Sequence, residues 1–468
     1  MYYLYIAANS LTKASGSSSD DGDGSDEENG SAENGFTKDG VSFTLKDMYG
    51  IRQIHNVGDD ELFKLLVNSL CPAIFGHEIV KAGLLLALFG GKRNENKDID
   101  IRSNPHVLVV GTEFWVHNGD PGLGKSQMLS AVVKAAPRGV YVCGNTTTTS
   151  GLTVTLCKDG ETGEAGLEAG ALVLGDRGVC CIDEFDKLTE YQALLEAMEQ
   201  QSISIAKAGM VCTLPARTSV IAAANPVGGH YNKAKTVSEN LKMNTALLSR
   251  FDLVFILLDK PNVEMDKFLS DHIMKLHSGN SKGKEKIVSK WGKENSVQSS
   301  SQDILSQDQP LAERLRVTSD DFDPVPLSLL RKYIAYSKKY TQPTEAALVL
   351  QEFYLTLRSK YRSIDSTPIT TRQLESMMRL VEARARAELR TEAVKQDALD
   401  VVAIMKFSLW DTYDDGVGGL CLPRSQLGVG SSKQNETKRF MTQLNRIVAE
   451  TSFDKFNFDQ LLEVAKGI

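Results

Sequence analysis

The chain has 468 residues, of which 41% are hydrophobic and 24% charged, and its formal net charge is −7. This length predicts two or three compact domains, and the composition is that of an ordinary soluble protein. The longest apolar run, near Ala82–Phe89, is far shorter than the roughly 20 residues that span a bilayer, so no membrane segment is predicted. The first residues, MYYLYIAANSL, lack the basic start and long apolar stretch of a secretory signal.

Cysteine usage and charge distribution narrow the class of protein further. The seven cysteines include no C-x-x-C pair, which argues against a zinc site or a disulfide framework and favours a reduced intracellular compartment. The acidic balance does not by itself indicate nucleic-acid binding. Much of it lies in one segment, Ser15 to Gly35, which is nearly free of large apolar residues and is predicted to be disordered.

Apolar, strand-like runs alternate with helical patterns in the first half of the chain. The expected strands are HVLVV, GVYVC, GVCCID, TSVIAAAN and LVFILL, and the expected helices include DELFKLLVNSL, GHEIVKAGLLLALFG, KSQMLSAVVKAA and YQALLEAMEQQ. This alternation predicts an α/β fold with a largely parallel sheet that is covered by helices on both faces. Beyond a low-complexity stretch, four helices are expected at about Pro326–Lys339, Thr344–Tyr361, Thr371–Leu389 and Lys395–Trp410.

A phosphate-binding signature, G-x-x-x-x-G-K-S, precedes one of these helices. The residues expected to bind the nucleotide are Gly119, Asp120, Pro121, Gly122, Leu123, Gly124, Lys125, Ser126 and Gln127. Backbone N–H groups of such a loop wrap phosphates at a helix N-terminus. Lys125 then neutralises the β- and γ-phosphates, and Ser126 holds Mg²⁺. The alternative interpretation is a glycine-rich turn before a helix.

Eight residues separate this signature from the strand that should lead into it. The strand HVLVV ends at Gly111, and TEFWVHNG follows before the signature continues. Deleting Thr112 to Gly119 joins the flanks into HVLVVGDPGLGKSQ, an uninterrupted strand and loop. We therefore interpret the eight residues as an insertion, from a splice variant or a gene-model error, with HVLVV as the buried strand. The alternative is that EFWV replaces HVLVV in the sheet.

Polar residues follow the next strands in positions that suit ATP hydrolysis. GVCCIDEF delivers Asp183 for Mg²⁺ and Glu184 as the general base for the attacking water. SVIAAANP ends in Asn225, which can orient that water or contact the γ-phosphate, although an Asn at a strand end also serves as a turn cap. Arg250, just ahead of LVFILL, either pairs with Asp252 in its own chain or acts as an arginine finger on a neighbouring subunit's nucleotide.

Several of these segments together resemble one known family. GDPGLGKSQ, CIDEFDK, AAANP, LLSRFDL and TTRQLES look like the minichromosome maintenance (MCM) family of AAA+ DNA helicases, and the resemblance covers roughly Ser42 to Trp410. The six replicative members usually have alanine before the P-loop lysine, where this chain has Gly124. With NPVGGHYNKAKTVSENLKM, this difference points to a member that works in homologous recombination and cross-link repair.

The resemblance implies an AAA+ P-loop NTPase core with a mostly parallel sheet, an all-α lid and a partial winged helix. Its cofactors are then ATP and Mg²⁺, with Ser126 and Asp183 at the metal and Asn225 as the first sensor. Arg250 and Arg372 act across the subunit boundary. The family's channel hairpin falls on SISIAKAGMVCTLP, where Lys207 is expected to face DNA.

The resemblance also implies a domain order, with an insert of the second helix at about Leu152–Leu172. The expected segments are 1–36, the end of an N-terminal OB-fold domain and an acidic disordered stretch; 37–277, the nucleotide-binding core; 278–315, a disordered linker; 316–412, the lid; 413–436, a linker; and 437–468, a partial winged helix. Only YYLYIAANSL resembles the last strand of the OB-fold.

The expected activity is that of an ATP hydrolase, a DNA helicase or translocase subunit in the nucleus. Its expected partners are single-stranded and forked DNA and homologous MCM subunits, in a homo- or hetero-hexamer that includes the ninth paralogue, and it acts in recombination, repair and possibly replication. Two alternatives remain at this point. One is a non-catalytic ring subunit or scaffold, which the expected insertion and the missing OB-fold favour. The other is an AAA+ remodeller of a protein substrate.

Overall fold

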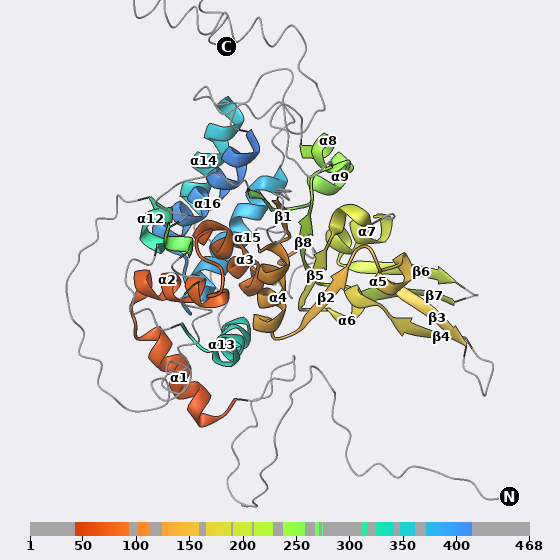
Figure 1. Cartoon of the computed structure of the whole chain (residues 1–468), viewed down its shortest axis with the longest axis horizontal. Helices are drawn as coiled ribbons and strands as arrows, with labels where there is room; N and C mark the ends of the chain where they lie inside the picture. The colour runs from red at the N-terminus through yellow and green to blue at the C-terminus, as the bar shows by residue number, and fades with distance from the viewer. Residues whose placement is uncertain are drawn as a thin grey trace, which may run out of the picture.

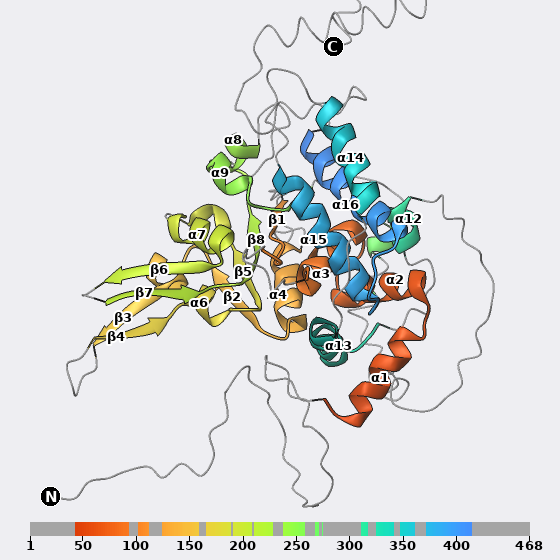
Figure 2. The same cartoon turned by 180° about the vertical axis from the view of Figure 1, so that it is seen from behind.

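Figure 1 shows a computed structural model of the chain, seen from behind in Figure 2. The structure describes residues 43–92, 102–111, 124–158, 165–188, 191–207, 210–227, 237–257, 267–270, 274, 310–316, 324–340, 347–360 and 371–413. The acidic segment Ser15 to Gly35, the predicted winged helix and most of the predicted linkers lie outside the described residues.

A five-stranded parallel sheet lies at the centre, with the strand order β2-β5-β8-β1-β9. The strands are β1 (Val107–Gly111), β2 (Gly139–Cys143), β5 (Val179–Asp183), β8 (Ser219–Ala224) and β9 (Leu253–Leu257). These are the five strands that the apolar runs predict, and they confirm the α/β class. HVLVV forms β1, which pairs with β8 on one side and β9 on the other.

Alternate residues of β1, β5, β8 and β9 enter two separate hydrophobic cores. In β1, Val107 and Val109 belong to one core, while Leu108 and Val110 belong to the other. Successive side chains point to opposite faces of a sheet, and both faces are covered here. This explains why the strands read as continuous apolar runs rather than alternating ones.

Helices from both halves of the chain cover the first face. The helices from the first half are α2 (Asp59–Leu70), α3 (Glu78–Phe89) and α4 (Lys125–Ala135), and those from the second are α13 (Leu327–Tyr340), α14 (Ala347–Lys360), α15 (Thr371–Ala387) and α16 (Lys395–Tyr413). The predicted helices are confirmed to within a few residues at each end. Because α15 packs on α3 and α16 packs on β9, the C-terminal helices share one core with the sheet.

Shorter elements cover the second face. They are α5 (Thr149–Leu152), α6 (Ala171–Leu174), the 3₁₀ turn η1 (Phe185–Lys187), α7 (Gln192–Gln200), α8 (Val237–Leu241) and α9 (Thr245–Leu248). Met198 of α7 and Leu247 of α9 are buried in the second core beside Val110 of β1. This face thus places α7 and α9 close to the strands that carry the predicted site residues.

Two antiparallel hairpins extend from this side of the sheet. One is β3 (Val154–Lys158) with β4 (Ala165–Ala169), and the other is β6 (Ser202–Lys207) with β7 (Met210–Pro215). Both views show the hairpins side by side, at the end of the molecule away from α12 and α14 (Figures 1 and 2). The hairpins lie where the family resemblance predicts the helix-2 insert and the channel hairpin.

A short helix, α12 (Leu311–Leu315), lies where we expected the end of a disordered linker. Leu311 and Leu315 are buried, and α12 packs on α2 and α3. Asn68 of α2 also donates a hydrogen bond to the carbonyl of Leu315 (3.0 Å). Contacts with α2 and α3, which are far away in the sequence, therefore stabilise α12, although the sequence that precedes it has low complexity.

The sequence analysis also did not predict α1 (Leu45–His55). This helix begins with a capping box, in which Thr44 and Asp47 each bond to the other's backbone N–H. Lys332 of α13 donates to Asp47 (2.7 Å) and ties α1 to the second half of the chain. None of the helices in the described ranges is long and apolar enough to cross a bilayer.

Candidate nucleotide-binding site and arginine cluster

The carboxyl ends of β1, β5 and β8 and the first residue of α4 meet at one edge of the sheet. Lys125 is buried, and its Nζ donates to the backbone carbonyl of Gly111 (2.9 Å) and to Oδ1 of Asn225. The structure therefore brings together the lysine of the predicted P-loop and the predicted first sensor. Asn225 is held in place in turn, because its backbone N–H donates to Asp186 of η1 (3.0 Å).

The start of α4 has the geometry of a phosphate-binding turn. Gly124 precedes the helix with φ of +72°, a conformation that side chains disfavour. A Cβ at this position would lie 2.7 Å from Cδ1 of Ile74. The N-cap residue Gly124 gives α4 no side-chain cap, and the N-terminus of a helix favours an anion. Ser126 is exposed in this first turn and Gln127 follows it.

The remaining predicted P-loop residues, Gly119 to Leu123, lie outside the described residues, as does TEFWVHN. The two ends of this stretch are nevertheless placed. A Cβ on Gly111 would lie 2.7 Å from Cδ of Lys125, so the end of β1 and the start of α4 are in contact. Gly111 thus stands where the strand of an uninterrupted P-loop would end.

The two acidic residues after β5 contact side chains of the edge strand β2. Tyr141 donates from its hydroxyl to Oδ2 of Asp183 (2.8 Å), and the thiol of Cys143 lies 3.5 Å from Oε2 of Glu184. Partial burial, together with the hydrogen bond to Asp183, raises the pKa of Tyr141. Glu184 adopts a left-handed backbone conformation (φ +50°) at the end of β5, which turns its side chain out of the strand direction.

These residues fit a nucleotide with a divalent cation. A hard cation such as Mg²⁺ takes oxygen ligands, and Ser126 and Asp183 supply a hydroxyl and a carboxylate at the same sheet edge as Lys125. The buried ammonium of Lys125 and the uncapped N-terminus of α4 suit phosphate oxygens. The arrangement can bind a nucleoside triphosphate and present Glu184 to a water molecule.

Arg250 and Arg372 lie at the opposite, amino edge of the sheet. Each donates to the carboxylate of Glu199 in the last turn of α7, and the Arg372 contact measures 2.7 Å. Arg250 also donates to the carbonyl of Ala246 (2.6 Å). The interpretation that Arg250 pairs with Asp252 is wrong, because other arginines occupy that carboxylate.

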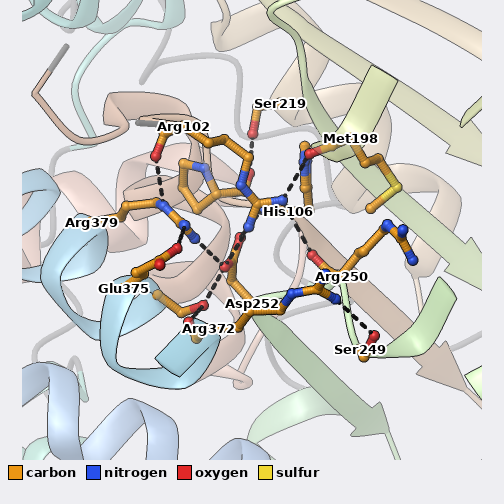
Figure 3. A network of polar contacts seen from close by, with 12 residues as sticks. Arg102, His106, Met198, Ser219, Ser249, Arg250, Asp252, Arg372, Glu375 and Arg379 are labelled. Atoms are coloured by element: carbon orange, nitrogen blue, oxygen red, sulfur yellow. Dashed lines mark hydrogen bonds and ion pairs between the residues drawn. The ribbon is translucent and has the colours of Figure 1, made fainter. Parts of the chain in front are cut away.

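Asp252 is the centre of a buried polar network beside these arginines (Figure 3). Arg102 binds it through both carboxylate oxygens (2.8 and 2.9 Å), and Arg379 donates to it at 2.7 Å. The hydroxyl of Ser376 and the backbone N–H of His106 also donate to it. Burial alone raises the pKa of Asp252, but the two guanidinium groups outweigh this effect and hold the pKa below its ordinary value.

His106 is a structural member of this network rather than a titrating one. Its Nδ1 accepts from the backbone N–H of Val220 (2.9 Å), and its Nε2 faces the carbonyl of Met198 (3.3 Å). Complete burial, helped by the nearby charge of Arg102, lowers its pKa to about 3. The imidazole therefore stays neutral at physiological pH.

The two edges are separated by the length of a strand. Asp252 bonds to His106, directly before β1, whereas Lys125 bonds to Gly111 at the end of β1. Five residue steps from His106 to Gly111, at about 3.3 Å each, put these two contacts roughly 16 Å apart. The described structure thus places the arginine cluster away from the nucleotide edge of its own subunit.

Lys207 is the last residue of β6 and pairs in register with Met210, the first residue of β7. The structure describes its backbone position near the hairpin tip but not its side chain. The hairpin brings Lys207 to neither the nucleotide edge nor the arginine cluster.

Sequence reasoning missed Glu199, Arg102, Tyr141 and Cys143. Tyr141 and Cys143 are two residues apart on β2 and so lie on the same face of the strand. Because β2 was expected beside the strand that carries Asp183 and Glu184, this spacing could have indicated the contacts. Glu199 had no comparable signal, because a glutamate near the end of a helix is common on protein surfaces. Arg102 contacts residues about 150 positions away, which no local pattern indicates.

Lys125 bonds to Asn225 at the carboxyl edge of a parallel sheet with the strand order β2-β5-β8-β1-β9, and Asp183 ends β5 at the same edge. Together with the helices that follow, this arrangement is that of an AAA+ type nucleotide-binding module. Comparison with protein families agrees with this class. The MCM P-loop domain matches residues 49–277, the MCM AAA-lid domain residues 328–409, and the MCM8 winged helix domain residues 422–468. The chain belongs to the minichromosome maintenance family. The winged-helix match begins inside the stretch predicted as a linker.

Several curated relatives of high identity have MCM8 in their names. The chain is 60% identical to "DNA helicase MCM8" of Bos taurus over 92% of its length, and 56% identical to that of Homo sapiens over all of its length. It is 48% identical to "Probable DNA helicase MCM8" of Arabidopsis thaliana. These alignments cover 52%, 54% and 58% of the relatives, so the chain spans about half of their length.

Proposed function

We propose that this chain is the ATP-hydrolysing part of a DNA helicase or translocase subunit that works in a hexameric ring. The observation that carries this proposal is the separation of the two edges of the sheet. Lys125, Asp183, Glu184 and Asn225 gather at one edge, and Arg250 and Arg372 gather at the other. Each subunit then offers a nucleotide edge to one neighbour and an arginine edge to the next.

The nucleotide edge binds ATP and Mg²⁺ through groups whose chemistry suits them. Lys125 neutralises phosphate charge at the start of α4, and Ser126 and Asp183 provide oxygen ligands for Mg²⁺. Asn225, already oriented by Asp186, contacts the γ-phosphate or the attacking water. Glu184 accepts the proton of that water. The P-loop residues from Gly119 to Leu123 complete the site in this proposal.

Arg250 and Arg372 act on the nucleotide of the adjacent subunit. A guanidinium at the transferring phosphoryl group stabilises charge that develops in the transition state. The roughly 16 Å between His106 and Gly111 supports this assignment, because the Asp252 network beside both arginines lies at the first end and Lys125 lies at the second.

The two hairpins are proposed to face DNA in the central channel of the ring. They extend side by side from the same part of the molecule, and Lys207 lies near the tip of the β6–β7 hairpin (Figure 2). The charge of a lysine there suits the phosphate backbone of single-stranded or forked DNA, without reading its sequence.

The name of the relatives supports the wider biological assignment. We propose that the ring is a homo-hexamer or a hetero-hexamer with the ninth MCM paralogue. We further propose that it acts in the nucleus in homologous recombination, repair and possibly replication. A non-catalytic ring subunit and a remodeller of protein substrates are the competing functions.

ATPase activity with and without single-stranded DNA separates the three functions. The proposal expects hydrolysis that single-stranded DNA stimulates, in the chain and in a version lacking Thr112 to Gly119. Hydrolysis that DNA does not affect would favour a protein remodeller. Rings that form without hydrolysis in either version would favour a scaffold.

A further inference from the structure

Arg250 and Arg372 come from distant parts of the chain and converge on one carboxylate. Arg250 follows α9 and Arg372 begins the lid helix α15, yet both donate to Glu199, through different oxygens. The side chains of Glu199 and Arg372 are each 45% exposed, and that of Arg250 is 17% exposed. The cluster of Glu199, Arg250 and Arg372, called here the arginine clamp, therefore reaches the protein surface mainly through Glu199 and Arg372.

The charges of the arginine clamp suit an anion from outside the subunit. Two guanidinium groups this close repel one another unless a counterion lies between them. Glu199 supplies one negative charge against two positive ones, so the clamp stays together and keeps a net positive charge. A carboxylate that accepts hydrogen bonds from both arginines also restricts the orientations of the two guanidinium groups. A flexible surface arginine has no such restriction.

The buried Asp252 network fixes the backbone beneath each member of the clamp. Arg102 donates to the carbonyls of Arg250 (3.4 Å) and of Met198 (3.1 Å), which precedes Glu199. Ser376 and Arg379, one and two turns beyond Arg372, both donate to Asp252. The three clamp residues thus lie on backbone that is held by the Asp252 network, of which Figure 3 labels Arg250 and Arg372 together with Asp252.

We propose that Glu199 is a positioning residue that holds Arg250 and Arg372 in register for the phosphate of a neighbouring subunit's nucleotide. This inference rests on the proposed function, since it assumes that both arginines act in trans. Glu199 does not itself contact the reacting atoms. Glu199 acts by holding the guanidinium groups of Arg250 and Arg372 close together, so that they need little reorganisation when they bind the neighbour's phosphate.

A mixture of two full-length variants isolates the relevant interface. Chains with Lys125→Ala keep the arginine clamp but lose their own nucleotide site, while chains with Arg250→Ala keep the nucleotide site but lose the finger. Only interfaces that combine the two can hydrolyse ATP, so activity should return when the chains are mixed in rings. If rings form and no activity returns, both the trans assignment and the role of Glu199 are overturned.

The position of a third substitution then tests Glu199 itself. Glu199→Gln on the Lys125→Ala chain, which presents the clamp, should lower kcat of the mixture by roughly 10- to 100-fold, the scale of a displaced catalytic group. The affinity for ATP of the other chain should not change. The same substitution on the Arg250→Ala chain should not change kcat of the mixture, because the clamp of that chain already lacks the finger and contributes to no active interface. If Glu199→Gln damaged the fold, activity would fall whichever of the two chains carried the substitution.

Glu352→Gln provides the matched control, since Glu352 is an exposed glutamate of α14 and not a member of the clamp. It should leave the mixture's kcat as it is in either chain. Thermal unfolding of Glu199→Gln should match that of the parent, because Glu199 is half exposed. Unchanged kcat with Glu199→Gln on the clamp-presenting chain would overturn the proposal. A rise in kcat would also overturn it and show that Glu199 competes with the phosphate.

Discussion

At the amino edge of the sheet, Asp252 accepts hydrogen bonds from two arginines, a serine and a backbone N–H, and its side chain is 1% exposed. At the carboxyl edge, Asp183 accepts from one tyrosine and one backbone N–H and remains partly exposed. The first carboxylate has its hydrogen-bonding capacity filled from within the subunit, whereas the second keeps capacity for a ligand. Because of this difference we assign a structural role to Asp252 and propose a role in the nucleotide site for Asp183.

The comparison also explains why the arginines of the amino edge divide into two sets. Arg102 and Arg379, whose side chains are 14% and 8% exposed, neutralise Asp252, whereas Arg250 (17% exposed) and Arg372 (45% exposed) share Glu199. The buried set joins the lid helix α15 to the start of β9. We propose that Arg250 and Arg372 act on a neighbouring subunit.

The largest effect is expected from removing the finger. Arg250→Ala should lower ATPase activity by about 10³- to 10⁵-fold, the range for arginine fingers. In rings that also contain unmodified chains, the loss should fall on the neighbour's site, and the rate per chain should rise with protein concentration. Arg52→Ala, at an exposed position of α1, is the control. A loss that stays the same at every ratio of variant to unmodified chain would place Arg250 in its own subunit's site.

The carboxyl edge should separate binding from hydrolysis. Lys125→Ala should abolish ATP binding because the phosphates lose their main cation. Glu184→Gln should retain binding and lower hydrolysis by about 10²- to 10⁴-fold, since only the general base is removed. Equilibrium titration with ATP and single-turnover hydrolysis measure the two quantities. Normal hydrolysis by Glu184→Gln would show that another group is the base.

Loss of the Asp252 carboxylate at the amino edge should lower the stability of the fold more than loss of the Asp183 carboxylate at the carboxyl edge. Asp252→Ala should reduce the free energy of unfolding by about 3–5 kcal/mol, because it leaves buried guanidinium groups without a counter-charge. Asp183→Ala, at the partly exposed carboxylate, is the matched control and should cost much less. Chemical denaturation measures both. Equal losses would contradict the contrast between the two edges.

The Asp252 carboxylate also gives a pH dependence with a definite sign. Its pKa in the folded chain lies below the value of 3.8 that describes the unfolded chain. The stability it contributes is therefore fully present above pH 3.8 and is lost as the pH falls through the folded-state pKa. Denaturation of the parent should show this acid loss, and Asp252→Ala should show less of it.

The smallest effect is expected from the eight residues before the P-loop. Deleting Thr112 to Gly119 should tighten ATP affinity, by up to about 10²-fold, because a loop held directly by its strand presents aligned N–H groups. The contact between Gly111 and Lys125 already places the two ends of the shortened loop side by side. Equal affinity with and without the segment would show that the fold accommodates TEFWVHNG.

Much of the α/β core could be predicted because its signals are local. The run HVLVV predicted a buried strand, and the structure places it in the middle of the sheet. Asp183 and Asn225 were placed at strand ends, and parallel strands bring such residues to one edge. The family could be inferred because the motifs occur in a fixed order, which is a property of the chain alone.

The short helix α12, the joining of the lid to the sheet, and the arginine clamp could not be predicted in this way. Leu311 and Leu315 are ordered by α2 and α3, and Glu199 meets Arg372 across 173 positions of the chain. Whether Arg250 pairs with Asp252 depended on whether Arg102 and Arg379 had already taken that carboxylate. Periodicity reports which face of an element is buried, but not what buries it.

The sequence by itself determined the class of fold, the positions of its strands and longer helices, and the residue types of a nucleotide site. Hydrophobic periodicity and motif spacing are sufficient for these, because each depends on neighbouring residues. Only the tertiary structure decided which carboxylate each arginine binds and at which edge of the sheet it lies. Charges form pairs according to distance and burial in the folded chain, and residues such as Arg102 and Asp252 become neighbours only after folding.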